Sequence, residues 1–344
     1  MKGLWKYISP FAPDQSGAAA VMYGLNGGIV VICDAGGCAG NICGFDEPRW
    51  FSGGKSAVFS AGLRDMDAIL GRDDRLVAKL ADAARQIDAS FAAIVGTPVP
   101  SVIGTDYRAL KRMAEKELSI PVVTLDTTGM ELYDAGIEKA YDTLFRAFAD
   151  SSMQAEDGVV GVIGAVPLDL MHPRDREGIV GALREEGWRQ VWLYDTFGEI
   201  AQAGKVSRNI VVSPSGLRSA KYLKETFGTP YEFRYFGLES VLPEGLDLSG
   251  ASVLVVHQQT AANAMRELAE RRGAKAVTVA SWFMEPQEWR REGDVLLKEE
   301  DDFRSLADND AFDIVIGDLY FKKALPHFRG IYIDFPHFAV SGRE

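Results

Sequence analysis

Gly28-Ile29-Val30-Val31-Ile32-Cys33-Asp34-Ala35-Gly36-Gly37-Cys38 is the most informative stretch of the chain. Its first five residues form a continuous apolar run, which is typical of a parallel strand buried on both faces. Glycines and polar residues follow at once, as at the end of a strand. In open α/β sheets, ligands bind beyond the carboxyl ends of the strands, where glycines let the backbone approach them closely. The stretch therefore predicts an α/β fold with a site at this strand end.

The cysteines gather at the same place. Cys33, Cys38 and Cys43 are the only cysteines of the chain. Thiolates are soft ligands, and clusters of them bind iron–sulfur centres, zinc or copper(I). The paired C-x2-C spacing that zinc sites commonly use is absent. The pattern is compatible with a metal site and equally with three small residues buried under a glycine-rich loop.

Composition limits the possible functions. With 344 residues, the chain is long enough for two or three domains, and its 47% hydrophobic and 25% charged residues are typical of soluble globular proteins. The formal net charge of −12 argues against a nucleic-acid partner, which requires a basic face. Neither a signal peptide nor an 18-residue apolar run is evident. We therefore expect a cytoplasmic protein without a membrane segment and, given its clustered cysteines, without structural disulfides.

Strand and helix patterns alternate along the whole chain. A short helix at residues 16–24 carries small residues on one face, which permits close packing. Two breaks in the alternation, Ser151–Asp157 and Pro243–Gly250, predict domain boundaries. We expect three Rossmann-like α/β domains with mainly parallel sheets around a shared interdomain cleft, spanning residues 1–150, 151–247 and 248–344. The predicted strands are 28–32, 91–95, 121–125, 159–163, 191–194, 209–212, 252–257, 276–280, 312–316 and 330–334.

Several polar residues follow these strands and are expected near the cleft. His257 ends a strand of the third domain and is compatible with a ligand, an acid or base, or a hydrogen-bonded core histidine. Ser213 follows a strand of the second domain. The other histidines, His172, His327 and His337, lie beside prolines in loops, which predicts turn or cap roles.

Motifs along most of the chain resemble, in order, those of the nitrogenase component 1 superfamily. This superfamily includes nitrogenase and the catalytic components of dark-operative protochlorophyllide reductase and related cofactor-reducing systems. The matching residues are Ser16-Gly17-Ala18, Gly24, Gly27, Gly37-Cys38, Phe59–Leu63, Gly71–Leu76, Val102–Asp106, Ile120-Pro121-Val122, Phe227-Gly228-Thr229-Pro230, Asp313–Asp318 and Ile333–His337.

The resemblance implies a three-domain α/β subunit that works as a homodimer or as a heterodimer with a related subunit. It implies an iron–sulfur cluster, [4Fe-4S] in type, near the dimer interface. It also implies an ATP-hydrolysing iron-protein partner as electron donor, and a small-molecule or cofactor substrate in the interdomain cleft.

The cluster-binding positions depart from the family pattern. Only Cys38 stands at one of the family's three usual cysteine positions, while Phe11 and Pro98 occupy the other two. Cys33, Cys38 and Cys43 are therefore the predicted metal ligands, as a local replacement. An iron–sulfur cluster takes about four ligands. The fourth would be Asp34, Asp46, a residue of a second subunit, a substrate atom or solvent.

Ser213 falls where nitrogenase has the cysteine that binds its active-site metal cluster, so dinitrogen reduction is not expected. We expect Ser213 and His257 to contact a cofactor. The candidate proton donors are His257, Asp34 and Glu285. The segment Phe45–Lys55, which contains Trp50, either docks the electron donor or packs on its own domain.

Three functions are compatible with these features. The first is an oxidoreductase component in which an iron–sulfur cluster relays low-potential electrons from the iron protein to a small molecule or cofactor. The second is a non-catalytic scaffold or carrier for assembly of a metal cluster. The third is a binding module in which the cysteines are structural.

Overall fold

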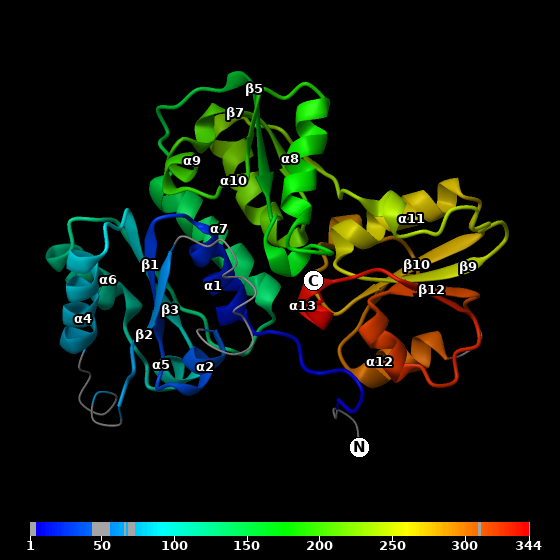
Figure 1. The fold of residues 1–344 in the computed structure, drawn as a ribbon, viewed down its shortest axis with the longest axis horizontal. Helices are drawn as coiled ribbons and strands as arrows, with labels where there is room; N and C mark the ends of the chain where they lie inside the picture. Colours follow the sequence, from blue (N-terminus) through cyan, green and yellow to red (C-terminus); the bar gives the residue numbers. More distant parts are fainter. Residues whose placement is uncertain (1–4, 43–55, 65–66, 68–72, 309–310, 344) are drawn as a thin grey trace.

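The computed structural model describes residues 5–42, 56–64, 67, 73–308 and 311–343, which form three lobes with one parallel sheet each (Figure 1). The first sheet has the order β2 (Ala57–Ser60), β1 (Gly28–Cys33), β3 (Phe91–Gly96), β4 (Val122–Leu125). The second has the order β6 (Gln190–Trp192), β5 (Glu156–Ile163), β7 (Val206–Val211), β8 (Tyr231–Phe233). The third has the order β11 (Val295–Leu296), β10 (Ala276–Ser281), β9 (Ser252–Val256), β12 (Ile314–Gly317), β13 (Ile331–Asp334).

Helices cover these sheets, and the alternation predicted from the sequence is confirmed. Within the described residues, no helix is long and apolar enough to span a membrane. The α-helices with described bounds are α1 (Asp14–Gly24), α2 (Gly37–Gly40), α4 (Asp73–Gln86), α5 (Pro98–Val102), α6 (Tyr107–Glu117), α7 (Tyr133–Phe148), α8 (Asp175–Glu185), α9 (Phe197–Ala201), α10 (Leu217–Phe227), α11 (Gln259–Arg271), α12 (Glu300–Ala307) and α13 (Phe338–Ser341).

Strand β1 is the buried strand that the apolar run predicts. Its side chains alternate between two cores, as the period of a strand requires. Val30 and Ile32 join the core that contains α1 and α7, whereas Val31 and Cys33 join the core that contains α4 and α6. The last residue of the strand, Cys33, therefore points away from the α1 side of the sheet.

Glycines bring α1 and α7 into close contact. A Cβ atom on Gly17 would lie 1.8 Å from the carbonyl oxygen of Tyr133, and one on Gly136 would lie 1.8 Å from the carbonyl oxygen of Asp14. The small-residue face predicted for the first helix is thus confirmed as a packing face. Since α7 also packs against α10, it joins the first lobe to the second (Figure 1).

The amino-terminal segment lies on the third lobe. One oxygen of the buried Glu300 carboxylate accepts hydrogen bonds from the amides of Lys6 (3.0 Å), Tyr7 (2.8 Å) and Ile8 (2.9 Å). Ile8 is part of the third-lobe core. The domain boundaries near residues 150 and 247 stay a prediction, and the residues before α1 pack outside the lobe to which they were assigned.

Candidate functional site

Asp34 anchors the loop that follows β1. Its buried carboxylate accepts hydrogen bonds from the amides of Gly36 and Ala39, both 2.9 Å long, and the Thr97 hydroxyl lies 2.9 Å from its other oxygen. Burial alone would raise the pKa of Asp34, but these hydrogen bonds outweigh it and hold the pKa below its usual value. Asp34 is therefore an ionised, fully bonded anchor, which makes it a poor proton donor.

The two described cysteines lie in different surroundings. Cys33 is 2% exposed and packs among apolar side chains of α4 and α6. Burial, together with the Asp73 and Asp34 carboxylates, raises the pKa of its thiol to about 12. Cys38 is partly exposed on α2, and burial and Asp34 raise its pKa too. The loop therefore presents Cys38 and not Cys33.

Cys43, Asp46 and the segment Phe45–Lys55 with Trp50 lie outside the described residues. Within the part of the chain that the structure describes, no group of three or more His, Cys, Asp or Glu side chains is arranged to hold a metal ion. The predicted set of three cysteines thus stays a prediction.

Pro98 lies beside the Cys38 loop. It begins α5, directly after the Thr97 that bonds Asp34. Gly129 packs so closely on it that an added Cβ would lie 2.5 Å from a Pro98 ring carbon, and its φ of +76° also favours glycine. The Asp14 carboxylate accepts the amides of Thr128 and Gly129 at 2.9 and 2.6 Å. Helices α1 and α5 are thereby fixed around the end of the first sheet.

Phe11, which the resemblance of the sequence motifs would place at a cysteine position, serves as an aromatic contact. Its ring lies 5.5 Å from that of Trp282 and 4.9 Å from that of Phe283, measured between centroids. It therefore ties the amino-terminal segment to the third lobe.

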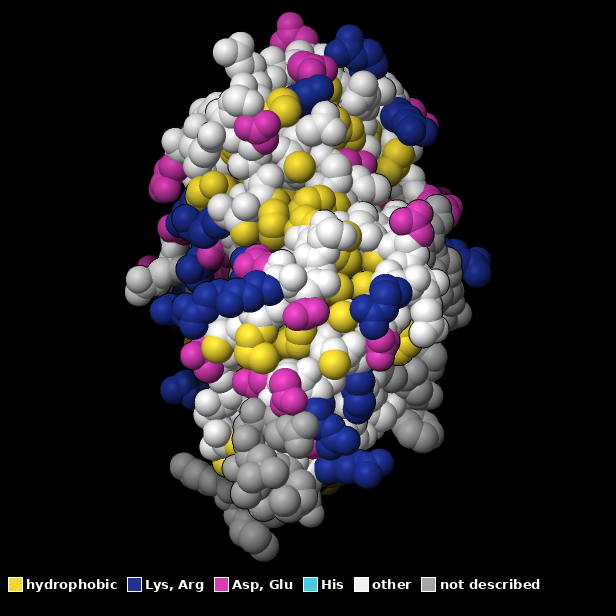
Figure 2. Space-filling model, turned by 90° about the vertical axis from the view of Figure 1, so that its left-hand side faces the viewer, with side chains coloured by type: hydrophobic (Ala, Val, Ile, Leu, Met, Phe, Trp, Pro, Cys, Tyr) yellow, Lys and Arg dark blue, Asp and Glu magenta, His cyan; other side chains and the backbone are white. Residues whose placement is uncertain are grey.

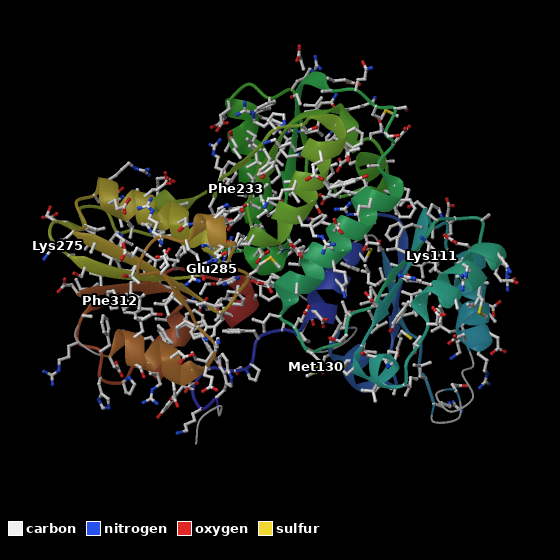
Figure 3. All side chains as sticks on the ribbon, turned by 180° about the vertical axis from the view of Figure 1, so that it is seen from behind. Lys111, Met130, Phe233, Lys275, Glu285 and Phe312 are labelled. Atoms are coloured by element: carbon white, nitrogen blue, oxygen red, sulfur yellow. The ribbon has the colours of Figure 1, made fainter. Side chains whose placement is uncertain are left out.

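Exposed apolar side chains surround this end of the first lobe. Val102 is 86% exposed and Met130 is 85% exposed, and Val99 and Ile103 are exposed as well. The contact between Gly129 and Pro98 brings Met130 close to α5, and Figure 3 shows Met130 at this end of the lobe. We call these four residues the α5 patch. An apolar surface of this kind is typical of interaction sites. On the neighbouring side face, acidic and basic side chains are intermixed (Figure 2).

Buried polar residues of all three lobes meet at one junction. The Asp169 carboxylate accepts hydrogen bonds from Ser213 (2.5 Å), Ser215 (3.1 Å) and Tyr133 (2.7 Å). The Tyr133 hydroxyl also lies 2.9 Å from Nε2 of His337. Burial raises the pKa of Asp169 to about 7, although the bonds from Ser213 and Tyr133 lower it. We call these five residues the junction network.

Ser213 is therefore enclosed by the protein itself. It is fully buried, and its hydroxyl is held by Asp169 and by Ser215, 2.9 Å away. A serine in this state has no free side-chain group to offer a metal cofactor. The junction of the lobes is filled by side chains at this point.

His257 stacks on His337 at the junction, with ring centroids 4.2 Å apart. Its Nδ1 accepts the amide of Gln258 at 2.8 Å, so its Nε2, 3.0 Å from the Pro336 carbonyl oxygen, carries the proton. Burial lowers the pKa of His257 to about 4. Of the roles left open by the sequence, the hydrogen-bonded core histidine fits this geometry.

His337 occupies the N-cap position of α13, in line with the turn or cap role predicted for it, and its carbonyl oxygen accepts the amides of Val340 and Ser341 at 2.8 and 3.2 Å. The side chain makes no cap hydrogen bond, although the residue precedes α13, and it is completely buried. Tertiary packing explains this burial. The Phe338 amide donates to the Leu170 carbonyl oxygen at 3.0 Å, which holds the carboxyl-terminal segment in the junction. Phe335 and Phe338, on either side of His337, were the signal for burial in the sequence.

Glu285 lies between the second and third lobes (Figure 3). Its side chain is 1% exposed, and one oxygen lies 3.2 Å from Nε of Arg290. Burial raises the pKa of Glu285 despite this neighbour. Asp34, His257 and Glu285 therefore do not form a common site.

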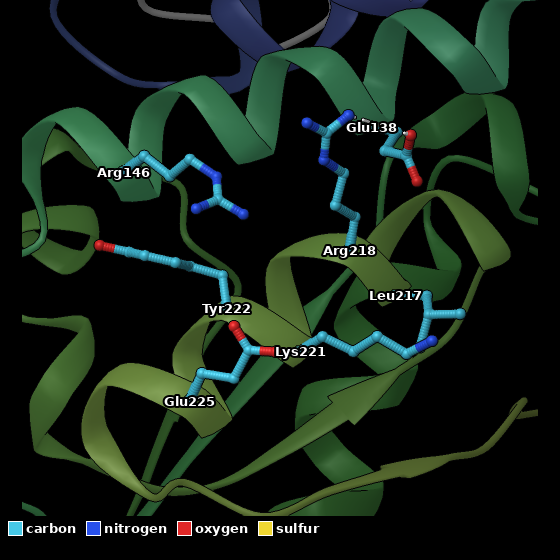
Figure 4. A pocket seen from close by; sticks show the side chains of 7 residues that line it. All are labelled: Glu138, Arg146, Leu217, Arg218, Lys221, Tyr222 and Glu225. Carbon is cyan, nitrogen blue, oxygen red and sulfur yellow. Dashed lines mark ion pairs between the residues drawn. The ribbon is translucent and has the colours of Figure 1, made fainter.

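A surface pocket of about 290 Å³ lies between α7 and α10 (Figure 4). Its basic side chains are already paired: Arg146 and Arg218 share the carboxylate of Asp142, at 2.7 and 3.2 Å. Lys221 pairs with Glu288 of the third lobe at 3.0 Å. The pocket contains none of the residues predicted from the sequence.

Residues 14–242 match the model of a protein family described as nitrogenase component 1 type oxidoreductase. The chain belongs to this family. The resemblance of its motifs is thereby confirmed.

A curated relative supports the same family. The chain is 25% identical over 187 residues to the nitrogenase iron-molybdenum cofactor biosynthesis protein NifE of Clostridium pasteurianum. The match covers 53% of this chain and 40% of that relative, so the chain matches less than half of the relative's length.

Solved structures confirm the fold. The structure titled nitrogenase Cp1 at pH 6.5 has a TM-score of 0.74 and 11% identity, over 97% of this chain and 87% of that one. The structure titled nitrogenase Cp1 at pH 5 has a TM-score of 0.75 and 14% identity, over 100% and 86%. The predicted three-domain, Rossmann-like α/β architecture is thus confirmed.

Proposed function

We propose that the chain is the cluster-binding component of a nitrogenase-like system, with a [4Fe-4S] cluster held between two copies of the chain. Low-potential electrons would arrive from an ATP-hydrolysing iron-protein partner and leave to a small molecule or cofactor. The observation that carries this proposal is the Cys38 loop, which Asp34 anchors at the strand end beside the exposed α5 patch.

The donor set fits such a cluster across a two-fold axis. Since Cys33 lies in the core, each chain offers Cys38 and Cys43. Two chains then offer four thiols, the number of ligands that a [4Fe-4S] cluster takes. A symmetric dimer apposes the same surface of both subunits, so one α5 patch would pack near its copy. When bound, the cluster would supply one-electron redox chemistry, while Asp34 holds the loop in place.

The junction of the lobes does not fit a metal cofactor at residue 213, because Asp169 and Ser215 satisfy the Ser213 hydroxyl. This observation favours a second candidate function, a scaffold or carrier on which a metal cluster is assembled. The name of the curated relative, a cofactor biosynthesis protein, points in the same direction.

The test of the cluster site is anaerobic purification, followed by iron and sulfide analysis and electron paramagnetic resonance. We expect about four iron atoms per dimer. The substitutions Cys38→Ala and Cys43→Ala should remove this iron. The matched control, Cys33→Ala, should keep it. A folded Cys33→Ala protein without iron would contradict the ligand set, and a native protein without iron after reconstitution would refute the cluster.

A second experiment separates the two functions. The iron-loaded protein is mixed anaerobically with an iron-protein ATPase and ATP, or with an apo-protein that accepts clusters. ATP-dependent reduction of the cluster, followed by its reoxidation when substrate is added, supports the reductase. Transfer of iron to the acceptor without ATP supports the carrier.

A further inference from the structure

Buried polar atoms of native proteins almost always have hydrogen-bond partners. Exceptions to this rule occur in several parts of the described chain, and a group of them gathers in one region of the third lobe. It lies between helix α11 and the segment 282–294 that follows β10. The atoms without a hydrogen bond include Nε2 and Oε1 of Gln259, Oδ1 of Asn263, Nε and Nη1 of Arg266, and both carboxylate oxygens of Glu285.

These side chains come together between α11 and the 282–294 segment. Gln259, Asn263 and Arg266 are spaced four and three residues apart, so they share one face of α11. This face meets the 282–294 segment: the Asn263 side-chain amide donates to the carbonyl oxygen of Trp289 at 3.3 Å, and Nη2 of Arg266 donates to both oxygens of Asp294 at 2.6 and 2.7 Å.

Two opposite charges in this region are not paired with each other. Arg266 and the Glu285 side chain are each 1% exposed and close enough to interact electrostatically. Yet Arg266 binds Asp294, and Glu285 lies beside Arg290. Buried opposite charges attract strongly. Arg266 therefore keeps two donors without hydrogen bonds, and Glu285 keeps two acceptors without hydrogen bonds, which one bridging group would satisfy.

We propose that this region binds a small zwitterion of the amino acid class. Its carboxylate would accept from Nε and Nη1 of Arg266 and from the Gln259 amide, and its ammonium group would donate to Glu285 and to Oδ1 of Asn263. The local charges support a ligand of no net charge, because Arg266 with Asp294 and Arg290 with Glu285 are each neutral pairs. The site is separate from the Cys38 loop, so it needs no cluster.

The test is thermal unfolding of the iron-free protein with single amino acids over a concentration series. Acetate and methylammonium, which each carry one half of the zwitterion, are tested beside them. We expect at least one amino acid to give a saturable rise in melting temperature that neither half reproduces. Glu285→Gln should weaken this binding roughly 10- to 100-fold, since a hydrogen bond to a charged group is lost. Glu288→Gln, an exposed carboxylate on the same segment, is the matched control.

Ordered water is the competing occupant. If no amino acid shifts the melting temperature and Asn263→Leu stabilises the protein, the region holds only water and the proposal is refuted. Equal effects of Glu285→Gln and Glu288→Gln on binding would refute it too. The iron content of the Cys38→Ala variant tests only the proposed function. It says nothing about amino acid binding at this site.

Discussion

Asp34 shows how one buried carboxylate shapes a candidate site. It uses both oxygens: one binds the amides of Gly36 and Ala39, and the other meets the Thr97 hydroxyl. Hydrogen bonds to a charged group in a buried place contribute more than neutral ones. The position of Cys38 therefore depends on a neighbouring residue that holds no cluster itself.

We expect Asp34→Asn to lower the free energy of unfolding by about 1–3 kcal/mol, because the charge-assisted hydrogen bonds from the Gly36 and Ala39 amides become weaker bonds to a neutral acceptor. The iron content after reconstitution should fall as well, since the Cys38 loop loses its anchor. Urea unfolding and iron analysis measure the two effects. Asp88→Asn, an exposed position, is the control and should stay within about 0.5 kcal/mol of the native protein. Equal stability of the two variants would contradict the anchor role.

At the scale of helices, the contact between α1 and α7 depends on two glycines without room for a side chain. At either glycine, an added Cβ atom would lie 1.8 Å from a backbone carbonyl oxygen of the other helix, so no side-chain rotamer change can relieve the clash. The helices would have to separate, and α7 links the first lobe to the second.

We expect Gly17→Ala to lower the free energy of unfolding by about 2 kcal/mol or more, because overpacking against backbone forces the helices apart. Gly178→Ala in α8 is the control: its Cβ would meet no atom within 4 Å. There alanine should stabilise the protein by about 0.5–1 kcal/mol through its helix propensity. Denaturant unfolding compares the two, and a stable Gly17→Ala protein would disprove the close contact.

Long apolar runs and clear helical periodicity were sufficient to predict most elements, whereas short edge strands were missed. Strands β8 and β11 have only three and two residues, too few to show a period. Helix α5 follows strand β3 directly and contains Pro98 and Pro100, two prolines that also resemble a turn. A proline in the first helical turn is nevertheless tolerated, because it lacks only an amide that needs no partner.

The candidate site was predictable only in part. The strand end with Cys38 followed from local sequence. The junction network did not, since Tyr133, Asp169 and His337 are far apart in the chain and meet only through the packing of three lobes. Nor does a cysteine spacing reveal that Cys33 points to the opposite side of the sheet from Val30 and Ile32.

At the scale of the whole molecule, the junction of the lobes contains two buried groups whose pH effects oppose each other: His257, which stacks on the junction network, and Asp169, which is part of it. Burial lowers the pKa of His257 from 6.5 to about 4, so its contribution to stability is present above pH 6.5 and is lost as the pH falls toward 4. Burial raises the pKa of Asp169 from 3.8 to about 7, so its contribution is present below pH 3.8 and is lost as the pH rises through 7. Between about pH 4 and pH 6.5, the pH-dependent contributions of His257 and Asp169 to stability therefore partly cancel.

Asp169→Asn removes the second of these effects. We expect the variant to lose stability more steeply than the native protein as the pH falls from about 7 to about 4.5, because the histidine effect is no longer offset. Urea unfolding at a series of pH values measures this slope. If stability depends on pH in the same way in the variant and the native protein, the pH effect does not come from Asp169. The Asp88→Asn variant should follow the native profile.

The hydrogen bonds of Glu300 bear on how the chain is completed during synthesis. They join residues 292 to 294 positions apart, so Lys6, Tyr7 and Ile8 leave the ribosome long before their partner exists. Contacts between such distant residues form late in folding, and exposed apolar segments are open to misassembly while they wait. Because Ile8 is part of the third-lobe core, we expect the docking of residues 5–11 to follow the formation of the other third-lobe contacts.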